Sequence, residues 1–345
     1  MKTFDPRTLL RENLSQLQSY SSAREEFAME TGMSFLDANE NPFESGLNRY
    51  PDPQQQKLKN KLADLKQIDA GKIILGNGSD ELLDLVLRCF CEPGRDSVIT
   101  LPPTYGMYGI LSRIHGVAVR EVPLDQNFQP DVQAIFEAVD DQTKLLFLCS
   151  PNNPSGNSLE TRYITELLDS FPGIVVLDEA YADFASGSMI EFLDDYPNLV
   201  ILQTFSKAYG LAGVRLGAGY ASEEIIRLLS KIKLPYNVNL LTQKVALERL
   251  EDAEGIQREI NDILDQRTYL KAQLELLPFV EKVYPSDANF LLVKVDDATV
   301  RYNQFLEAGI VVRNRSGELN CEQTLRITVG TPQENEQLLE VAKGF

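Results

Sequence analysis

The sequence predicts an α/β fold: a mainly parallel sheet with helices on both faces, followed by a smaller α+β domain. Between about residues 72 and 220, short apolar runs alternate with amphipathic stretches. Several runs are nearly continuous in Val, Ile and Leu, which is typical of strands buried on both faces. Strands that alternate with helices in this way favour parallel pairing. After Leu234 the pattern changes to long helices followed by strands, which predicts the smaller domain.

The elements of the large domain follow from these patterns. The predicted strands are Lys72–Leu75, Ser97–Leu101, Val117–Val122, Lys144–Cys149, Ile174–Leu177, Val200–Thr204 and Leu216–Tyr220. The predicted helices between them are Ser79–Cys91, Tyr105–His115, Pro130–Val139 and Leu159–Ser170. Ser79 is placed to cap its helix, and Asp80 and Glu81 in the first turn suit the positive end of the helix dipole.

Both ends of the chain differ from this central part. Residues 1–35 are polar and irregular and predict an N-terminal arm with one short helix near Pro6–Gln18. The predicted C-terminal elements are a helix Leu241–Leu277 bent near Gly255, strands Ala288–Val295, Gly309–Arg313 and Leu325–Val329, and a helix Pro332–Lys343. We expect a large domain over residues 36–240 and a small domain over residues 241–345, packed tightly because no flexible linker separates them.

Composition excludes several classes of protein. The 345 residues carry 33 Lys and Arg against 51 Asp and Glu, a net charge of −18, which argues against a nucleic-acid backbone as the general partner. No apolar run approaches the length of a membrane span, about 18 residues. The charged N-terminus lacks the apolar core of a secretory signal. We therefore expect a cytoplasmic protein that binds neither nucleic acid nor membranes.

Residue counts also limit metal and proton chemistry. The four cysteines form no C-x-x-C pair, which argues against a zinc or thioredoxin-type site. The single histidine, His115, precedes Gly116 in a pattern typical of a helix end. We expect a structural role for His115 and no metal site. Proton transfer at neutral pH must then come from Lys, Tyr, Asp, Glu or a cofactor.

Four short motifs carry side chains suited to chemistry. Gly76-Asn77-Gly78-Ser79-Asp80-Glu81 joins a strand to a helix, where backbone N–H groups can bind a phosphate; a plain structural turn fits the same residues equally well. Asn153, in Ser150-Pro151-Asn152-Asn153-Pro154-Ser155-Gly156, follows the predicted strand Lys144–Cys149, at the edge where parallel sheets bind ligands. Taken alone, this loop is typical of a simple turn.

The other two motifs add ionisable groups. Asp178 ends an apolar strand, where a carboxylate is costly to bury unless it faces a cation or donor, and Tyr181 follows it. A Walker-B-like strand end or a helix cap is the simpler interpretation of this motif taken alone. Lys207 lies in Thr204-Phe205-Ser206-Lys207-Ala208-Tyr209-Gly210-Leu211-Ala212-Gly213-Val214-Arg215-Leu216-Gly217. A desolvated lysine can form a Schiff base, and Arg215 can bind a phosphate.

Together the four motifs match what pyridoxal phosphate needs from a protein: a phosphate site, an aspartate for the pyridinium nitrogen, a tyrosine near the phenolic oxygen and a Schiff-base lysine. Their order, N-N-P-S-G, D-E-A-Y and S-K-A-Y-G-L-A-G-V-R-L-G, resembles the fold-type I, class II aminotransferases. It closely resembles the histidinol-phosphate aminotransferase family over nearly the whole chain. Supporting motifs are Asp37-Ala38-Asn39-Glu40-Asn41-Pro42, Arg49-Tyr50-Pro51-Asp52, Pro102-Pro103-Thr104-Tyr105, Leu234-Pro235-Tyr236-Asn237-Val238-Asn239 and Leu325-Arg326-Ile327-Thr328-Val329-Gly330.

The resemblance implies a role for each matching residue. Lys207 holds pyridoxal 5'-phosphate and, once substrate displaces it, moves the proton at the substrate α-carbon. Asp178 pairs with the pyridinium nitrogen. The remaining implied cofactor contacts are Tyr181 and Asn153 to the phenolic oxygen and Tyr105 stacked on the ring. At the phosphate they are the backbone groups of Ser79 and Asp80, with Ser206 and Arg215. Tyr50 is implied to reach the partner's cofactor phosphate in a homodimer with shared active sites.

The resemblance also implies the substrates, L-histidinol phosphate and 2-oxoglutarate or glutamate, exchanged in histidine biosynthesis. Arg326, Arg313 and Tyr20 would bind the phosphate ester, and Arg326 alone would suit glutamate. Asn237 is placed by position near the imidazole. Two alternatives of the same fold are a threonine-phosphate decarboxylase and a broad aromatic aminotransferase. A ligand-sensing module of a transcription regulator would need a DNA-binding domain, for which residues 1–35 are too short.

Overall fold

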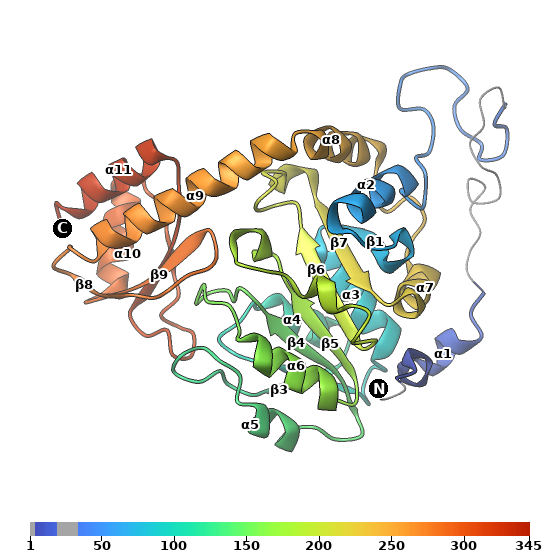
Figure 1. The fold of residues 1–345 in the computed structure, drawn as a ribbon, viewed down its shortest axis with the longest axis horizontal. Helices are drawn as coiled ribbons and strands as arrows, with labels where there is room; N and C mark the ends of the chain where they lie inside the picture. Colours follow the sequence, from blue (N-terminus) through green and yellow to red (C-terminus); the bar gives the residue numbers. More distant parts are fainter. Residues whose placement is uncertain (1–3, 19–33) are drawn as a thin grey trace.

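A seven-stranded sheet forms the centre of the computed structural model, which describes residues 4–18 and 34–345 (Figure 1). Its strand order is β1-β7-β6-β5-β4-β2-β3. The bounds are β1 (Ile73–Asn77), β2 (Ser97–Thr100), β3 (Ala118–Glu121), β4 (Thr143–Cys149), β5 (Ile174–Asp178), β6 (Leu199–Thr204) and β7 (Leu216–Ala221). Strand β7 pairs antiparallel with both of its neighbours, and the pairs from β6 to β3 are parallel. The expected mainly parallel sheet is confirmed.

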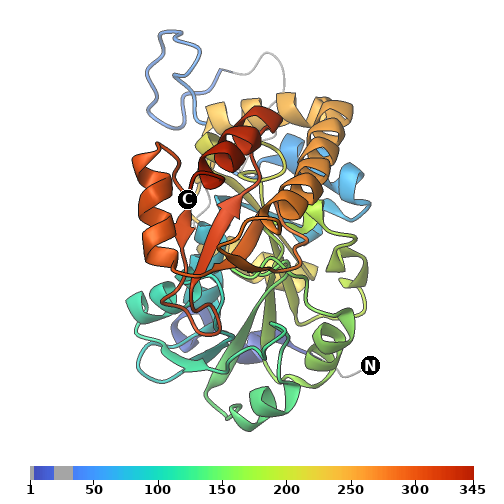
Figure 2. The ribbon, with the colours of Figure 1, turned by 90° about the vertical axis from the view of Figure 1, so that its left-hand side faces the viewer.

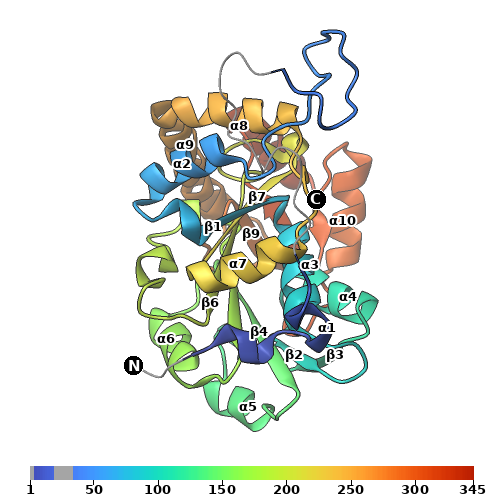
Figure 3. The ribbon, with the colours of Figure 1, turned by 90° about the vertical axis from the view of Figure 1, so that its right-hand side faces the viewer.

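Helices cover both faces of this sheet because its strands are apolar on both sides. Along β1, Ile73 and Leu75 point into one core layer and Ile74 into the other, as the two-residue period of a strand requires. The first layer packs against α2 (Gln56–Lys66), α6 (Thr161–Ser170) and α8 (Leu240–Glu251), with α5 (Val132–Glu137) beside α6. The second packs against α3 (Ser79–Phe90), α4 (Met107–Ile114) and α7 (Glu223–Ile232). Figure 3 looks onto α7 and onto α1 (Glu12–Ser15) below it.

A second sheet, of order β10-β11-β9-β8, forms the smaller C-terminal part. Its strands β8 (Val280–Val283), β9 (Phe290–Val295), β10 (Arg313–Asn314) and β11 (Thr324–Thr328) pair antiparallel. Helices α9 (Ala253–Leu274), α10 (Ala298–Glu307) and α11 (Pro332–Ala342) pack on it around a separate apolar core (Figure 2). Short 3₁₀ turns complete the described chain: η1 (Pro6–Leu9), η2 (Ala70–Lys72), η3 (Ala182–Phe184), η4 (Met189–Phe192) and η5 (Ala212–Val214).

Four local expectations need correction. Ser79 does not cap α3, because Gly78 occupies the N-cap position and Ser79 is the first residue of the helix. The predicted helix 241–277 is two helices, because Asp252 ends α8 and caps α9 by accepting a hydrogen bond from the Gly255 N–H at 3.0 Å. The predicted strand Gly309–Arg313 is paired only at Arg313–Asn314, since Gly309 has φ +79° and turns the chain after α10. The single helix expected near Pro6–Gln18 is the short η1 followed by α1.

The two sheets meet through polar contacts as well as packing. The Asp287 N–H donates to the Gly156 carbonyl at 2.7 Å, and the Asp287 carboxylate accepts from the Ser158 N–H at 2.9 Å. Within the small part, Arg267 of α9 donates to the adjacent Ala288 carbonyl at 2.8 Å. The Asp287 bonds hold the small sheet over the loop that follows β4, and a cavity lies between the two parts. Across residues 4–18 and 34–345, we find no helix with the length and apolar character of a bilayer span.

Candidate active site

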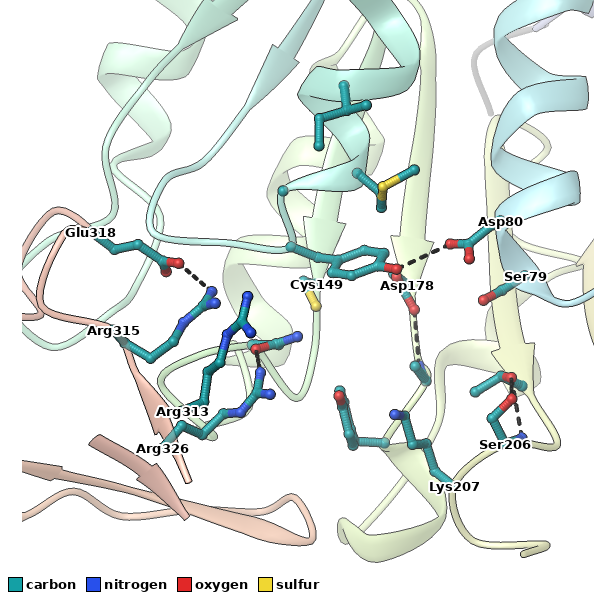
Figure 4. A pocket seen from close by; sticks show the side chains of 18 of the residues that line it. Ser79, Asp80, Cys149, Asp178, Ser206, Lys207, Arg313, Arg315, Glu318 and Arg326 are labelled. Atoms are coloured by element: carbon teal, nitrogen blue, oxygen red, sulfur yellow. Dashed lines mark hydrogen bonds and ion pairs between the residues drawn. The ribbon is translucent and has the colours of Figure 1, made fainter. Parts of the chain in front are cut away.

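A cavity of about 540 Å³ lies at the carboxyl ends of β4, β5 and β6, facing β10 and β11 of the small sheet. Figure 4 shows Lys207 and Asp178 reaching into it from the large sheet, and Arg313, Arg315 and Arg326 from the small one. The lining residues are Ser79, Asp80, Tyr105, Gly106, Met107, Ile110, Cys149, Asn153, Asp178, Ala180, Tyr181, Thr204, Ser206, Lys207, Arg215, Arg313, Arg315, Glu318 and Arg326. Ligands of open α/β sheets bind at this edge.

Lys207 lies on the loop between β6 and β7, and its ammonium faces the cavity beside Tyr181. The Nζ atom lies 5.5 Å from the centroid of the Tyr181 ring. Burial lowers the pKa of Lys207, the nearby Arg326 and Arg215 lower it further, and Asp178 opposes them. A lower pKa increases the fraction of neutral amine, which is the form that attacks a carbonyl carbon.

Asp178 ends β5 with its carboxylate in the cavity wall and is only 3% exposed. One oxygen accepts from the Tyr108 hydroxyl at 2.7 Å and the other from the Ala180 N–H at 3.0 Å. Desolvation nevertheless raises the pKa of Asp178 to about 6, against the lowering effect of those two hydrogen bonds. In the part of the chain that the structure describes, this buried carboxylate has two donors and no cation in contact, so it is suited to a positively charged partner.

Tyr108 holds the Asp178 carboxylate in position through the hydrogen bond from its hydroxyl. It is 1% exposed, and its ring stacks on Phe147 of β4 with centroids 5.1 Å apart and planes 4° from parallel. Tyr105, which lies just before α4, meets the Tyr108 ring edge-on and donates to Asp80 at 3.2 Å. Packing therefore sets the position of Tyr108, and its hydroxyl sets the position of Asp178.

Asn153 and Tyr181 face the same space from the loops after β4 and β5. The Asn153 Oδ1 atom accepts from Arg326 at 2.5 Å, which links the large and small sheets inside the cavity. Tyr181 is 7% exposed and packs edge-on against Phe290, with centroids 5.2 Å apart. Burial raises the pKa of Tyr181, so its hydroxyl stays protonated and can donate.

The N-terminus of α3 meets Arg215 and Ser206 at one end of the cavity. Arg215 donates to the Ser206 hydroxyl at 3.3 Å and lies 3.9 Å from an Asp80 oxygen. Two glycines permit this approach: a Cβ at Gly78, where φ is +77°, would lie 2.6 Å from Arg215, and one at Gly217 would lie 2.3 Å from the Ser79 nitrogen. Backbone N–H groups at a helix start, a hydroxyl and a guanidinium are the donors that a phosphate group takes.

The residues present therefore fit pyridoxal phosphate on structural grounds. The hydrogen-bond donors at the start of α3 can bind its phosphate, and the buried Asp178 carboxylate can pair with its protonated ring nitrogen. Lys207 projects its amine into the space between them. The same cavity holds every predicted cofactor contact except Tyr50.

Arginines dominate the opposite wall, on the small sheet. Arg313 of β10 pairs directly across from Arg326 of β11, and Arg315 follows two residues later. Arg315 forms an ion pair with Glu318. Burial lowers the pKa of Arg326, Tyr181 opposes this, and the positive charges of Arg315 and Arg313 lower it further. This wall is therefore suited to an anionic group of the ligand.

Some predicted site residues lie elsewhere. Asn237 does not line the cavity: its amide donates to the Leu75 carbonyl at 3.0 Å and to Glu81 at 2.9 Å, and its oxygen accepts from Lys233 at 2.9 Å. Its proposed place beside the imidazole has no geometric support, because those bonds hold it under β1. Tyr20 lies outside the described residues.

Tyr50 and His115 also lie away from the cavity. Tyr50 is 47% exposed, stacks on Tyr236 with centroids 4.5 Å apart, and lines a separate surface hollow. His115 ends α4, where its Nε2 lies 2.5 Å from an Asp84 oxygen. That position fits the structural role expected for it.

Sequence reasoning missed Tyr108, Arg315 and Glu318. The spacing of Tyr108, three residues after Tyr105 on a predicted helix, offered a weak signal that both face the same way. Arg315 stands two residues after Arg313, which places both on one face of an extended strand. Glu318 carried no signal, because its place in the cavity comes from the turn that follows β10.

Comparisons with known proteins identify the family of the chain. The sequence model of the family described as aminotransferase class I and II matches residues 35–341. A histidinol-phosphate aminotransferase of Flavobacterium johnsoniae is 56% identical over 346 residues, covering 99% of each chain.

Solved structures share the fold. A histidinol-phosphate aminotransferase from Clostridium acetobutylicum superposes with a TM-score of 0.80 at 24% identity, covering 87% of this chain and 91% of that one. One from Sinorhizobium meliloti, solved in complex with pyridoxal 5'-phosphate, gives a TM-score of 0.77 at 26% identity, covering 86% of this chain and 83% of that one.

Proposed function

Because the chain belongs to the aminotransferase class I and II family, we infer that it is a pyridoxal-phosphate-dependent transaminase acting in histidine biosynthesis. It exchanges an amino group between L-histidinol phosphate and 2-oxoglutarate. The observation that carries this inference is one cavity holding Lys207 and Asp178 on one wall and Arg313 and Arg326 on the other. The 56% identity to a full-length relative of that name supports the choice of substrate.

When bound, pyridoxal phosphate supplies an electron sink that stabilises negative charge at the substrate α-carbon. Lys207 holds the cofactor and then, as a free amine, moves the proton at that carbon; its lowered pKa favours the form that accepts a proton. Asp178, fixed by Tyr108 and the Ala180 N–H, holds a proton on the pyridinium nitrogen.

The other side chains of the cavity orient the two partners. Tyr181 and Asn153 donate to the phenolic oxygen of the cofactor, and Tyr105 stacks on its ring. The backbone N–H groups of Ser79 and Asp80, the Ser206 hydroxyl and the Arg215 guanidinium hold its phosphate at the start of α3.

Arg313 and Arg326 select the substrate by charge. A phosphate monoester is close to a dianion at neutral pH, and guanidinium groups bind its oxygens in pairs. Arg326, fixed by Asn153, also holds the carboxylate of glutamate in the other half-reaction. Tyr20 of the N-terminal arm is proposed to bind the phosphate ester together with the two arginines.

The enzyme is proposed to work as a cytoplasmic homodimer in which Tyr50 completes the neighbouring site. Tyr50 lies outside its own cavity, beside exposed Leu47, Leu240 and Leu241 at a surface hollow of about 440 Å³. A two-fold interface would bury this surface and repeat the Tyr50 contact in both sites.

Mixing two inactive variants tests the shared site. In a K207A/Y50A heterodimer, one site has Lys207 and also receives Tyr50 from the K207A subunit. Activity should therefore reappear on mixing under exchange conditions, because one intact site forms per heterodimer. No recovery in heterodimers confirmed by sedimentation would contradict the exchange of Tyr50 between subunits.

The substrate assignment is tested by assaying purified holoenzyme with L-histidinol phosphate, O-phospho-L-threonine and L-phenylalanine. Each is supplied with 2-oxoglutarate, and glutamate and carbon dioxide are both measured. We expect glutamate from histidinol phosphate at a kcat/KM at least tenfold above that for phenylalanine, and no carbon dioxide. Carbon dioxide from the threonine phosphate would support the decarboxylase instead, and a preference for phenylalanine would support the aromatic aminotransferase.

A further inference from the structure

We propose that Arg315 is a third substrate-anion ligand of this site and that Glu318 sets the charge of the group to match a phosphate dianion. The inference rests on the proposed function and extends it by naming two residues that decide between a phosphate ester and a carboxylate. It is carried by strand register, by the ion pair of Arg315 with Glu318, and by charge.

Strand register places three guanidinium groups on one face. Arg313 and Arg326 stand opposite each other in the β10–β11 ladder, and directly opposite residues share a face. The Arg315 N–H donates to the Thr324 carbonyl at 2.9 Å, so the pairing continues past β10. Residues two apart on a strand point the same way. Arg315 therefore faces the cavity with the other two, as Figure 4 shows.

The Arg315–Glu318 pair is only partly satisfied. One guanidinium nitrogen of Arg315 contacts one Glu318 oxygen. The buried Arg315 Nε and the buried second Glu318 oxygen have no hydrogen-bond partner within the described part of the chain. A buried donor left unpaired costs free energy, and a guanidinium has five N–H donors. Arg315 can therefore bind an incoming anion without giving up Glu318.

Charge then favours a dianion over a monoanion. Three arginines and one glutamate give this wall a net charge of 3 − 1 = +2. A phosphate monoester carries about −1.5 to −2 at neutral pH and offers three terminal oxygens, one for each guanidinium. A carboxylate carries one charge and two oxygens, which Arg326 alone satisfies in a bidentate pair. Arg315 should therefore matter for the phosphate ester and little for glutamate.

A merely structural role predicts something different. If Arg315 and Glu318 serve only to hold the turn after β10, removal of either partner breaks the same ion pair and has the same effect. If Arg315 binds the anion, removal of Arg315 weakens phosphate binding. Removal of the Glu318 charge leaves phosphate binding as strong or strengthens it, because it takes away a like charge.

The experiment measures binding of inorganic phosphate to the holoenzyme by calorimetry at constant ionic strength. The cofactor's own phosphate then fills the site at α3. The variants are R315Q, R315K and E318Q. R301Q is the matched control, since it removes a half-buried arginine paired with Asp296 at 2.7 Å in the same part of the fold, away from the cavity. Single-turnover half-reactions with histidinol phosphate and with glutamate are measured in parallel.

We expect R315Q to raise the Kd for phosphate about tenfold or more, the range for a hydrogen bond to a charged group, and to change the glutamate half-reaction less than about threefold. R315K should recover part of the loss, E318Q should bind phosphate at least as tightly as wild type, and R301Q should match wild type. The proposal is overturned if wild type does not bind phosphate, if R315Q does not weaken it, or if R315Q and E318Q weaken it equally. If R315Q loses phosphate binding but the wild-type enzyme does not transaminate histidinol phosphate, the anion site is supported and the proposed function is rejected.

Discussion

Replacement of Asp178 by asparagine should stabilise the cofactor-free protein and, at the same time, weaken its binding of the cofactor. The carboxylate is 3% exposed, and no cation of the described residues contacts it. Burial raises its pKa from 3.8 to about 6. A carboxyl group whose pKa is raised by folding stabilises the fold below its ordinary pKa. That contribution is lost as the pH rises through 6. At neutral pH the charged form is therefore a cost to the folded state.

The size of this cost follows from the shift. About two pKa units correspond to ~3 kcal/mol at pH 7.5, and linkage reduces the difference to ~1 kcal/mol at pH 4.5. Asparagine is nearly isosteric: its oxygen can accept the Ala180 N–H, and its amide can donate to the Tyr108 hydroxyl oxygen. D178N should therefore gain stability at pH 7.5 and lose most of that gain at pH 4.5.

Urea unfolding of cofactor-free wild type and D178N, followed by circular dichroism at both pH values, measures this difference. Protein concentration must be held constant because an oligomer's apparent stability depends on it. Cofactor titration should show D178N binding at least tenfold more weakly, since a contact to a charged group is lost. A stability difference between the two proteins that is the same at both pH values would refute the desolvation of Asp178.

Three further substitutions test the rest of the site. Borohydride reduction of the holoenzyme should fix the cofactor on Lys207, and K207A should bind the cofactor without a covalent link. Lys231 lies outside the cavity and donates to the Leu14 carbonyl. Cofactor found on Lys231 after reduction would show that the assignment of Lys207 is wrong. Y108F keeps the stack on Phe147 but removes the 2.7 Å hydrogen bond to Asp178, so the Kd for the cofactor should rise about tenfold. The control Y269F removes an exposed hydrogen bond to Glu336 and should leave that Kd unchanged. R313A should weaken histidinol phosphate about tenfold or more in single-turnover half-reactions and glutamate much less; equal effects on both would remove Arg313 as the phosphate selector.

The central sheet could be predicted from the sequence because its strands are apolar on both faces. Runs such as Ile174–Asp178 have no polar residue until the strand ends, and the carboxyl-end rule then places Asp178 near Asn153 and Lys207. The small sheet was harder to predict. Its outer strand β8 is an edge strand in which Glu281 and Lys282 are exposed, so its sequence contains no continuous apolar run that would indicate a strand.

Other features of the site depend on contacts between distant segments. Tyr108 reaches Asp178 across 70 residues, and no local pattern records that pairing. Asn237 looked like a pocket residue by position, but its hydrogen bonds to Leu75 and Glu81 hold it under β1. The role of Tyr50 and the domain limits at residues 35/36 and 240/241 stay predictions.

One measurement tests the central claim most directly: single-turnover reaction of the wild-type holoenzyme with L-histidinol phosphate and with L-histidinol, which lacks the phosphate. The absorbance of the bound cofactor reports transfer of the amino group in each case. The account predicts full conversion by histidinol phosphate and an apparent affinity for L-histidinol lower by at least tenfold, because the arginine wall then has no anion to bind. Equal rates and affinities for both compounds would contradict an active site built around a phosphate ester.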